Sequence, residues 1–386
     1  MNLNQNLTPI LVETLEQLAR EGLIDLRGAL EKLFNELMKI EREQAINASP
    51  YERSELRKDQ SNGFKNKMLQ TRVGNLQLSV PQTRNQPFYP MCLEKGERTE
   101  RAFKLAIAEM YVNGVATRRI KKITEKLCGE ELTSSQVSRM AKVMDEELDK
   151  FRNRALSSFR FVYLDAHYEK VRFEGVVRSL AVFKAIGVNE QGFREVLGIS
   201  CGLSEAEVHW KKFLESLLKR GLKGIQLITS DDHSGLKAAL NSVLPSVCWQ
   251  RCIFHLAQNA QNHISKREMK KTIAASVREI YQANSREEAQ SRLQKVIDEY
   301  EGKENKFCQW LEENFEEGLS FYQFPKELWK KLRTSNSVER MNREIRRRTN
   351  VAGLFPSIAS CERLVSAVAL DIHEDWFTGR KYMTLD

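Results

Sequence analysis

The feature that most constrains the fold of this chain is a stretch in which strand-like and helix-like segments alternate, residues 159–252. Its strand-like runs are rich in β-branched and aromatic residues and are separated by glycine and polar residues, as β-strands usually are. These runs are FRFVYLDA, EKVRFEG, SLAVFKAIGVN, REVLGISCGLS, GIQLITSDD and SVCWQRC. Helical segments at 204–221 and 233–242 separate the last three of them. We therefore predict the order β-β-β-α-β-α-β and a mixed α/β sheet.

Helical sequence follows this region. Residues 253–330 are rich in Lys, Glu and Gln and interrupt the α/β pattern, and a last helical part covers 337–376. The predicted strand order is that of the ribonuclease H-like fold. We expect an α/β protein with a ribonuclease H-like core, which an all-helical stretch interrupts and mainly helical N-terminal regions precede.

The beginning of the chain predicts helices over residues 8–45, where leucines recur near helical spacing. Residues 50–96 differ, because they are polar, basic and punctuated by prolines. Within them, TRVGNLQLSVPQTR alternates like a short hairpin or an edge strand. We interpret this segment as a loop-rich basic arm that contacts DNA, and a flexible linker explains it equally well.

Residues 99–150 predict three helices. The first ends at Gly114 and the second at Gly129, and the third begins with Thr133 or Ser134 as its N-cap. This spacing is that of a helix-turn-helix. The recognition helix would then begin with Ser135, Gln136, Ser138 and Arg139, and the helix before it carries Arg118, Arg119, Lys121 and Lys122. Three-helix packing without DNA is the alternative.

Composition narrows the class of protein. The chain has 61 Lys and Arg against 52 Asp and Glu, and this net charge of +9 mildly favours nucleic acid or another polyanion as a partner. Seven dispersed cysteines, an odd number, argue against a disulfide framework and for a reducing cytosol. The sequence predicts neither a signal peptide nor a transmembrane helix, and hence a cytoplasmic protein.

Two acidic residues end apolar strand-like runs. Asp165 ends FVYLDA, and Asp231 ends IQLITSD. Carboxylates at the C-terminal ends of adjacent strands in an open α/β sheet project into one crevice. With a carboxylate from a helix they could hold two divalent cations, which clamp an in-line phosphoryl displacement. The alternative for each acid is a strand-end turn or a helix N-cap, and Asp232 suits the cap of the helix at 233 better than Asp231.

The segment RTSNSVERMNREIRRRTN, residues 333–350, places Glu339 at the head of a strongly basic helix. Val338, Met341 and Ile345 form an apolar face by their spacing. The arginines of this segment that follow Glu339 are Arg340, Arg343, Arg346, Arg347 and Arg348. A carboxylate beside the core with basic neighbours suits a metal next to a DNA backbone. A solvated amphipathic helix with i,i+4 ion pairs is the alternative.

A third candidate is WQRCIFHLAQN, residues 249–259. Cys252 and His255 lie three residues apart, and with Cys248 and His263 they could be read as a zinc site of non-standard spacing. Trp249 could stack on an unpaired base. A tryptophan that ends a short strand is as readily a core residue.

Together these segments resemble bacterial insertion-sequence transposases of the IS256 family, which are related to the eukaryotic Mutator-like transposases. The resemblance is carried by YERSELRKDQSNGFKNKMLQTRVGNLQLSVP, YLDAHYEKVR, SDDHSGLKAAL, WQRCIFHLAQN and RTSNSVERMNREIRRRTNVAGLFPS, in this order. It implies a DDE recombinase that uses Mg²⁺ or Mn²⁺. Such enzymes cut at terminal inverted repeats, often through a circular intermediate.

The resemblance also implies roles for single residues. Asp165, Asp231 and Glu339 match the catalytic acids and metal ligands. Cys252 and His255 match a pair thought to support the active site and not to bind zinc, and Trp249 matches a position suspected of handling a flipped base. The residues expected to contact DNA are Trp249, Arg251, Arg340, Arg343, Arg346, Arg347, Arg348, Arg118, Arg119, Gln136 and Arg139.

We expect the chain to be organised in segments of different function. These are an N-terminal helical region (1–48), the basic arm (49–98), a helix-turn-helix-like domain (99–155), the first part of the core (156–265), the insertion (266–332) and the C-terminal core helices with the third acid (333–386). The expected partner is double-stranded DNA, both transposon ends and target, bound by a homodimer. The rival functions are a metal-dependent nuclease or resolvase, and a helix-turn-helix repressor derived from an inactive transposase.

Overall fold

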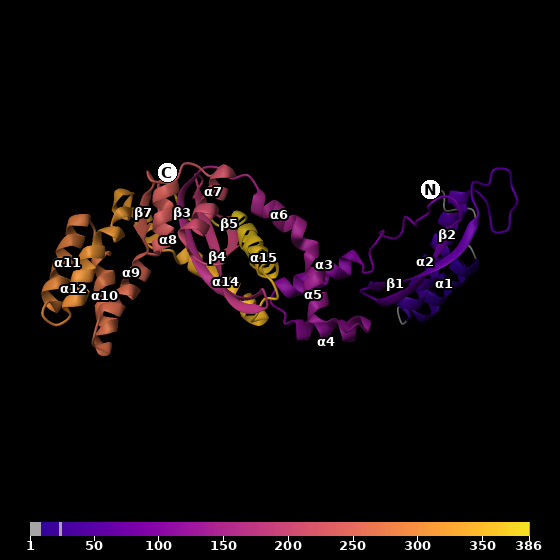
Figure 1. The fold of residues 1–386 in the computed structure, drawn as a ribbon, viewed down its shortest axis with the longest axis horizontal. Helices are drawn as coiled ribbons and strands as arrows, with labels where there is room; N and C mark the ends of the chain where they lie inside the picture. The colour runs from indigo at the N-terminus through magenta and orange to yellow at the C-terminus, as the bar shows by residue number, and fades with distance from the viewer. Residues whose placement is uncertain (1–8, 23–24, 386) are drawn as a thin grey trace. The chain divides into compact units, whose positions relative to one another are not determined.

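The computed structural model describes residues 9–22 and 25–385, and the chain divides into two compact units, Met1–Met144 and Asp145–Asp386. Each unit has a hydrophobic core of its own. Figure 1 shows the helices and strands of both units. The division falls after a 3₁₀ turn, η1 (Ala141–Met144), which interrupts the predicted third helix of the 99–150 region. Within the described ranges, no helix is both long enough and apolar enough to cross a membrane.

The first unit opens with two helices and a long antiparallel hairpin: α1 (Pro9–Glu21), α2 (Leu26–Ile46), β1 (Ser61–Thr71) and β2 (Gly74–Thr83). In β2, Leu76 and Leu78 are buried against Met38 of α2. Strand β1 is mostly polar and exposed, and its backbone pairing with β2 holds it in place. The predicted hairpin or edge strand in TRVGNLQLSVPQTR corresponds to β2, and residues 84–98 contain neither helix nor strand. The loop-rich prediction is wrong for β1, which has no apolar alternation of its own.

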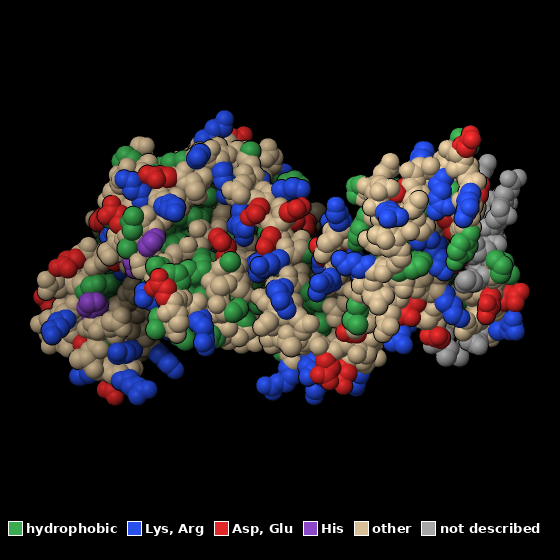
Figure 2. All heavy atoms as spheres, turned by 45° about the vertical axis from the view of Figure 1, so that its right-hand side comes forward, with side chains coloured by type: hydrophobic (Ala, Val, Ile, Leu, Met, Phe, Trp, Pro, Cys, Tyr) green, Lys and Arg blue, Asp and Glu red, His purple; other side chains and the backbone are tan. Residues whose placement is uncertain are grey.

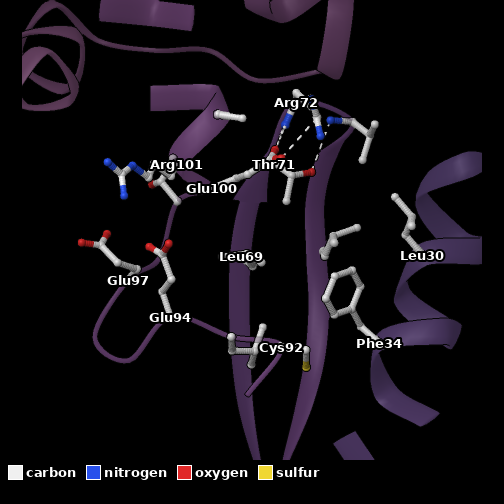
Figure 3. A pocket seen from close by; sticks show the side chains of 15 residues that line it. Leu30, Phe34, Leu69, Thr71, Arg72, Cys92, Glu94, Glu97, Glu100 and Arg101 are labelled. Carbon is white, nitrogen blue, oxygen red and sulfur yellow. Dashed lines mark hydrogen bonds and ion pairs between the residues drawn. The ribbon is translucent and has the colours of Figure 1, made fainter. Parts of the chain in front are cut away.

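A cavity of about 450 Å³ lies between this hairpin and α2 (Figure 3). Its lining includes the apolar Leu30, Phe34 and Leu69 and the acidic Glu94, Glu97 and Glu100. Glu100 pairs with Arg72 at 3.2 Å, and Glu97 pairs with Lys104. Two of these three carboxylates thus already have a basic partner.

Three short helices complete the first unit: α3 (Arg101–Val112), α4 (Thr117–Cys128) and α5 (Ser134–Met140). They pack around Phe103, Ile107 and Val137. Thr133 is the N-cap of α5, as one of the two predicted alternatives. Its Oγ1 accepts from the backbone N–H of Gln136, and its own N–H donates to Gln136 Oε1 at 2.8 Å, which forms a capping box.

The second unit contains a five-stranded mixed sheet in the order β5-β4-β3-β6-β7, so the predicted mixed α/β sheet is confirmed. The strands are β3 (Phe159–Phe173), β4 (Val176–Asn189), β5 (Arg194–Gly202), β6 (Leu227–Ser230) and β7 (Cys248–Arg251). Strands β3, β4 and β5 form an antiparallel meander, whereas β6 pairs parallel to β3 and β7 parallel to β6.

Helices cover both faces of this sheet. The helices of this unit that precede or pack around the sheet are α6 (Asp145–Asn153), α7 (Glu207–Lys219), α8 (Ser234–Val243), α14 (Asn336–Ala352) and α15 (Ile358–Phe377). Of these, α14 contacts β3 and β4, α15 contacts β5, and α6 packs against α15. Leu164 of β3 packs with Trp210 of α7 and Leu236 of α8 in one buried cluster. Because side chains alternate along a strand, the next residue, Asp165, points to the other face, where Asn342 of α14 contacts it.

A run of helices separates β7 from α14, as the sequence predicts. It comprises α9 (Ile253–Ala260), α10 (Lys270–Ile280), α11 (Arg286–Tyr300), α12 (Asn305–Asn314) and α13 (Lys326–Leu332), with short 3₁₀ turns between them. The run begins and ends at one point. The N–H of Ile253 donates to the carbonyl of Arg333 at 3.0 Å, and Ser335 Oγ lies 3.2 Å from Cys252 Sγ.

Candidate active site between strand β3 and helix α14

Asp165 lies inside a strand and not at its end, which corrects the sequence-based expectation. Strand β3 continues to Phe173, because EKVRF pairs with β4 as the second half of a long hairpin. The parallel pairing of β3 with β6, however, ends at Tyr163 and Thr229. Asp165 and Asp231 each follow two residues later, so both carboxylates lie at the same level of the sheet.

The Asp165 carboxylate is held by two donors. Lys184 Nζ and Asn342 Nδ2 both donate to its Oδ2, at 2.8 Å and 2.7 Å. Burial raises the pKa of Asp165, but the charge and hydrogen bond of Lys184 and the hydrogen bond of Asn342 outweigh burial and bring that pKa below its ordinary value. Asp165 is therefore an ionised carboxylate at neutral pH.

Lys184 extends this contact into a network. Its Nζ also lies 2.8 Å from His167 Nδ1 and donates to Asn342 Oδ1. The other ring nitrogen of His167 lies 3.0 Å from Glu169, whose carboxylate accepts from Thr349 Oγ1 of α14 at 2.8 Å. The network thus connects β3 and β4 with α14, which it contacts at two positions two helical turns apart.

The two neighbouring aspartates of the SDDH segment have different partners. Asp231 Oδ1 accepts from the backbone N–H of Asp232 at 2.7 Å. The Asp232 carboxylate instead pairs with Arg251 and Lys237, each at 3.1 Å. The expected capping role of Asp232 is wrong, because His233 is the N-cap residue of α8. Because Asp232 is engaged in these ion pairs, Asp231 is the candidate partner of Asp165.

Glu339 lies in the first turn of α14, three residues before Asn342, so both side chains lie on one side of the helix. Since Asn342 bonds to Asp165, Glu339 is presented to the same face of the sheet. Its Oε1 is buried and, among the residues that the structure describes, has no hydrogen-bond partner. A buried carboxylate oxygen without a partner is costly, and a cation is the usual compensation.

Cys252 and His255 form a hydrogen-bonded pair beside these acids. Burial raises the pKa of Cys252, but His255 and Ser335 more than offset it and bring that pKa below its ordinary value. Burial lowers the pKa of His255, but Cys252, Asp231 and Asp165 outweigh it and raise that pKa to about 9. The negative charges of both aspartates therefore contribute to the raised pKa of His255.

The structure does not support a zinc site formed by Cys248, Cys252, His255 and His263. His263 stacks on Trp310 with ring centroids 4.9 Å apart, and Cys252 is engaged with His255 and Ser335. In the described part of the chain, no three His, Cys, Asp or Glu side chains are already gathered to hold a metal ion.

A hard divalent cation nevertheless fits the chemistry of the three acids. Asp165, Asp231 and Glu339 offer only carboxylate oxygens, which Mg²⁺ and Mn²⁺ prefer. Within the described residues, the hydrogen bonds to Asp165 fall on Oδ2 alone, and Glu339 Oε1 has no partner. Each of these two acids thus keeps an oxygen that is free to bind a cation.

The arginines predicted to contact DNA divide into exposed and buried ones. Arg340, Arg343, Arg346 and Arg347 are exposed on α14. Arg348 is buried and pairs with Glu344 at 3.0 Å. Arg251 is 1% exposed and pairs with Asp232 and with Glu317. Neither guanidinium can reach a phosphate without breaking these ion pairs, so the structure gives no support to the predictions that Arg251 and Arg348 contact DNA.

Trp249 is half-buried in β7 and packs against the core. Its Nε1 donates to Ser230 Oγ at 2.8 Å, and Lys237 Nζ lies 4.8 Å from the centre of its ring. The residue thus fits the core alternative that the sequence left open, and one ring face already has a cation over it.

In the first unit, Arg118, Arg119 and Arg139 are exposed, while the Oε1 of Gln136 accepts a hydrogen bond in the capping box. Figure 2 shows Lys and Arg side chains dispersed among acidic ones on the face that it draws. On this face the basic side chains are therefore spread out, and single arginines have to be tested individually.

Sequence reasoning missed Lys184, Asn342 and His167. Asn342 stood in the quoted basic helix at i+3 from Glu339, and that spacing was a signal. Lys184 is a lone charge in the apolar run SLAVFKAIGVN, which is also a signal, because an unpaired lysine is rarely buried in a strand.

Known proteins resemble this chain over nearly its whole length. The sequence model of one family, described as "Transposase, Mutator family", matches residues 7–379. The transposase for insertion sequence element IS406 of Burkholderia multivorans is 48% identical over 96% of each chain. That for ISRM5 of Rhizobium meliloti is 39% identical over 94% of this chain and 91% of the relative. That for IS256 in transposon Tn4001 of Staphylococcus aureus is 36% identical over 93% of each.

Proposed function

This chain belongs to the Mutator family of transposases, and we propose that it is a DDE-type enzyme whose acids Asp165, Asp231 and Glu339 bind divalent metal for DNA cleavage and strand transfer. The observation that carries the proposal is the meeting of β3, β6 and α14. Parallel pairing sets Asp165 and Asp231 at one level, and Asn342 bonds Asp165 one helical turn after Glu339.

The chemistry divides between the metal and the protein. Bound Mg²⁺ or Mn²⁺ would neutralise the attacking and leaving oxygens of an in-line phosphoryl transfer. The chain itself supplies the carboxylates and fixes their orientation through Lys184 and Asn342. Cys252 and His255 support the site from the N-cap and first turn of α9, because Ser335 at the head of α14 contacts the Cys252 thiol.

The strand order supports a ribonuclease H-like core for the second unit. Three antiparallel strands followed by two parallel ones, with the first strand in the centre, is the arrangement expected of that fold. The helices between β7 and α14 are then the insertion that precedes the third acid. For the first unit, the capped helix α5 after α4 supports a helix-turn-helix that binds the terminal inverted repeats.

Exposed arginines supply the proposed contacts to DNA. Arg340, Arg343, Arg346 and Arg347 lie on the helix that carries Glu339, so phosphates bound there would lie close to the acids. Phosphate contacts give affinity and register but no base readout. Recognition of the inverted repeat therefore falls to the first unit, in which Arg118, Arg119 and Arg139 are accessible. Two copies acting on paired ends make a homodimer.

Cleavage of a labelled duplex that carries the terminal inverted repeat tests the proposal. With Mg²⁺, the unaltered protein should nick this duplex and join a pre-cleaved end to target DNA. Glu339→Gln should bind the same duplex but neither nick nor join it. Glu344→Gln is the matched control on the same helix, because Glu344 pairs with Arg347 and Arg348 and not with the acids.

Each rival function predicts a different result in this assay. A nuclease would nick the duplex but leave the pre-cleaved end unjoined. A repressor would bind equally well without divalent metal and leave the DNA intact. Activity retained by Glu339→Gln would show that the third acid lies elsewhere.

A further inference from the structure

Lys184 is a cation built into the sheet directly opposite Asp165. The antiparallel register of β3 and β4 pairs these two residues, so their side chains leave the same face side by side. Lys184 is 0% exposed. Its ammonium group has three hydrogens and three acceptors: Asp165 Oδ2, His167 Nδ1 and Asn342 Oδ1.

This burial excludes the ordinary roles of a lysine. A side chain without exposed surface cannot contact a DNA phosphate, and its charge cannot contribute to solubility at the protein surface. A buried ammonium is expensive unless it is paired and hydrogen-bonded, and here Asp165 provides the opposite charge. Since Asp165 is equally expensive to bury without a cation, each of the two groups compensates the other.

The acceptor geometry shows which part of Asp165 is committed. Lys184 and Asn342 both bond to Oδ2, and in the described residues nothing bonds to Oδ1. The Oδ2 atom therefore fixes the rotation of the carboxylate, and Oδ1 remains for a further cation. Asn342 connects Asp165 and Lys184, because its amide group donates to the first and its amide oxygen accepts from the second.

We infer that Lys184 is a positioning residue that acts as the built-in counter-cation of Asp165: it holds the carboxylate in place before metal binds and lowers the affinity for that metal. The inference rests on the proposed metal-binding role of Asp165. Two consequences follow from elementary electrostatics. The site stays folded without metal, and a divalent ion that arrives meets a positive charge already present.

The test uses the full-length protein, Mn²⁺ alone as the probe and the variant Lys184→Met. Thermal unfolding is recorded with and without Mn²⁺, and the Mn²⁺ dissociation constant is obtained from the electron paramagnetic resonance signal of free Mn²⁺. We expect metal-free Lys184→Met to melt below the unaltered protein. Mn²⁺ should raise its Tm by more than it raises the Tm of the unaltered protein, and bind it about tenfold or more tightly.

Two controls separate charge from packing. Lys170→Met removes an exposed lysine of β3 that bonds Ser179, and it should change neither Mn²⁺ affinity nor the Tm gain from Mn²⁺. Lys184→Arg keeps the charge and should keep the Mn²⁺ affinity of the unaltered protein within about threefold, even if packing lowers its Tm. A merely structural lysine would instead give Lys184→Met the same loss of Tm with and without Mn²⁺.

Every remaining outcome also decides the matter. If Lys184→Met refolds only with Mn²⁺ present, the inference holds, because the metal replaces the ammonium. If it refolds in neither condition, or binds Mn²⁺ no more tightly than the unaltered protein, the inference is overturned. Asp165→Asn in the same titration separates this failure from that of the proposed function: if Mn²⁺ binding to the unaltered protein does not depend on Asp165, the proposed function fails first.

Discussion

Asn342 of helix α14 donates a hydrogen bond of 2.7 Å to Oδ2 of Asp165 in strand β3, 177 residues earlier in the chain. This bond joins the helix that carries Glu339 to the strand that carries the first acid. This amide side chain is thus one of the contacts that set the distance between the two carboxylates, beside the bond from Thr349 to Glu169.

Replacing that amide should disable the proposed chemistry without affecting DNA binding. Asn342→Leu removes both the donor to Asp165 and the acceptor of Lys184. We expect cleavage of the inverted-repeat duplex to fall by roughly 10–100-fold, as is usual when a partner of a metal ligand is lost. Binding of the same duplex, measured by fluorescence anisotropy, should stay within about twofold. A variant that cleaves at the original rate would show that Asn342 does not position Asp165.

Arg251 should behave as a structural residue and not as a DNA contact. Arg251→Met leaves Asp232 and Glu317 without their buried partner. We expect a loss of about 2 kcal/mol of unfolding free energy, below the value for a fully buried pair because both acids are about one quarter exposed. Chemical denaturation measures this loss. The salt dependence of DNA binding should stay unchanged, and a smaller slope would restore Arg251 to the DNA-contacting set.

Two arginines of α14 offer a matched pair for the DNA interface. Arg343 is exposed, whereas Arg348 is buried against Glu344. Arg343→Ala should weaken binding and reduce the slope of log K against log salt by about 1, because one phosphate contact is lost. Arg348→Ala should lower the Tm and leave the slope unchanged. Equal slopes for both variants would mean that Arg343 makes no phosphate contact.

The pair of Cys252 and His255 predicts a pH dependence of stability. The pKa of His255 rises from its ordinary 6.5 to about 9 in the folded protein. The folded state thus holds this proton more tightly than the unfolded chain does. The stabilisation from this proton is complete below pH 6.5 and is lost as pH rises through about 9. The lowered pKa of Cys252 acts in the opposite direction, because it adds stability as pH rises, and it makes the net fall smaller.

Thermal unfolding between pH 6.5 and 9 measures this effect. We expect the Tm of the unaltered protein to fall by roughly 2–4 °C more than that of His255→Gln across this window. Cys252→Ser should flatten the dependence as well, because the thiol is the main group that raises the histidine pKa. His263→Gln is the control, since that ring only stacks on Trp310, and it should keep the dependence of the unaltered protein.

The parts of the fold that sequence predicts are those set by local pattern. Buried strands appear as apolar runs, and helices as periodic segments, so the order of elements from Phe159 to Arg251 follows from the residues alone. Asp165 and Asp231 share one level because the parallel register of β3 and β6 pairs Tyr163 with Thr229, two residues before each acid. The extra length of β3 beyond Asp165 depends on pairing with β4, which local pattern does not encode.

The partners of the acids depend on contacts between distant segments. Lys184 meets Asp165 only through the hairpin register, and Asn342 does so only because α14 crosses β3 at that point. Charge alone also cannot tell which arginine faces inward. For Arg348 the helical spacing does: it follows Val338, Met341 and Ile345 at i+10, i+7 and i+3, on the apolar face.

The meeting of Cys252 and Ser335 has an evolutionary consequence. These residues lie 83 positions apart, yet their side chains touch, so the two ends of the intervening run of helices meet at one neck. Glu317 and Ser320, near the end of that run, also contact strand β7. Lengthening or trimming the outer helices changes a closed loop without changing the separation of its ends, and the entropic cost of such a change grows only with the logarithm of loop length. The insertion can thus diverge as an exchangeable module, while selection on the neck keeps Glu339 in register with the two aspartates.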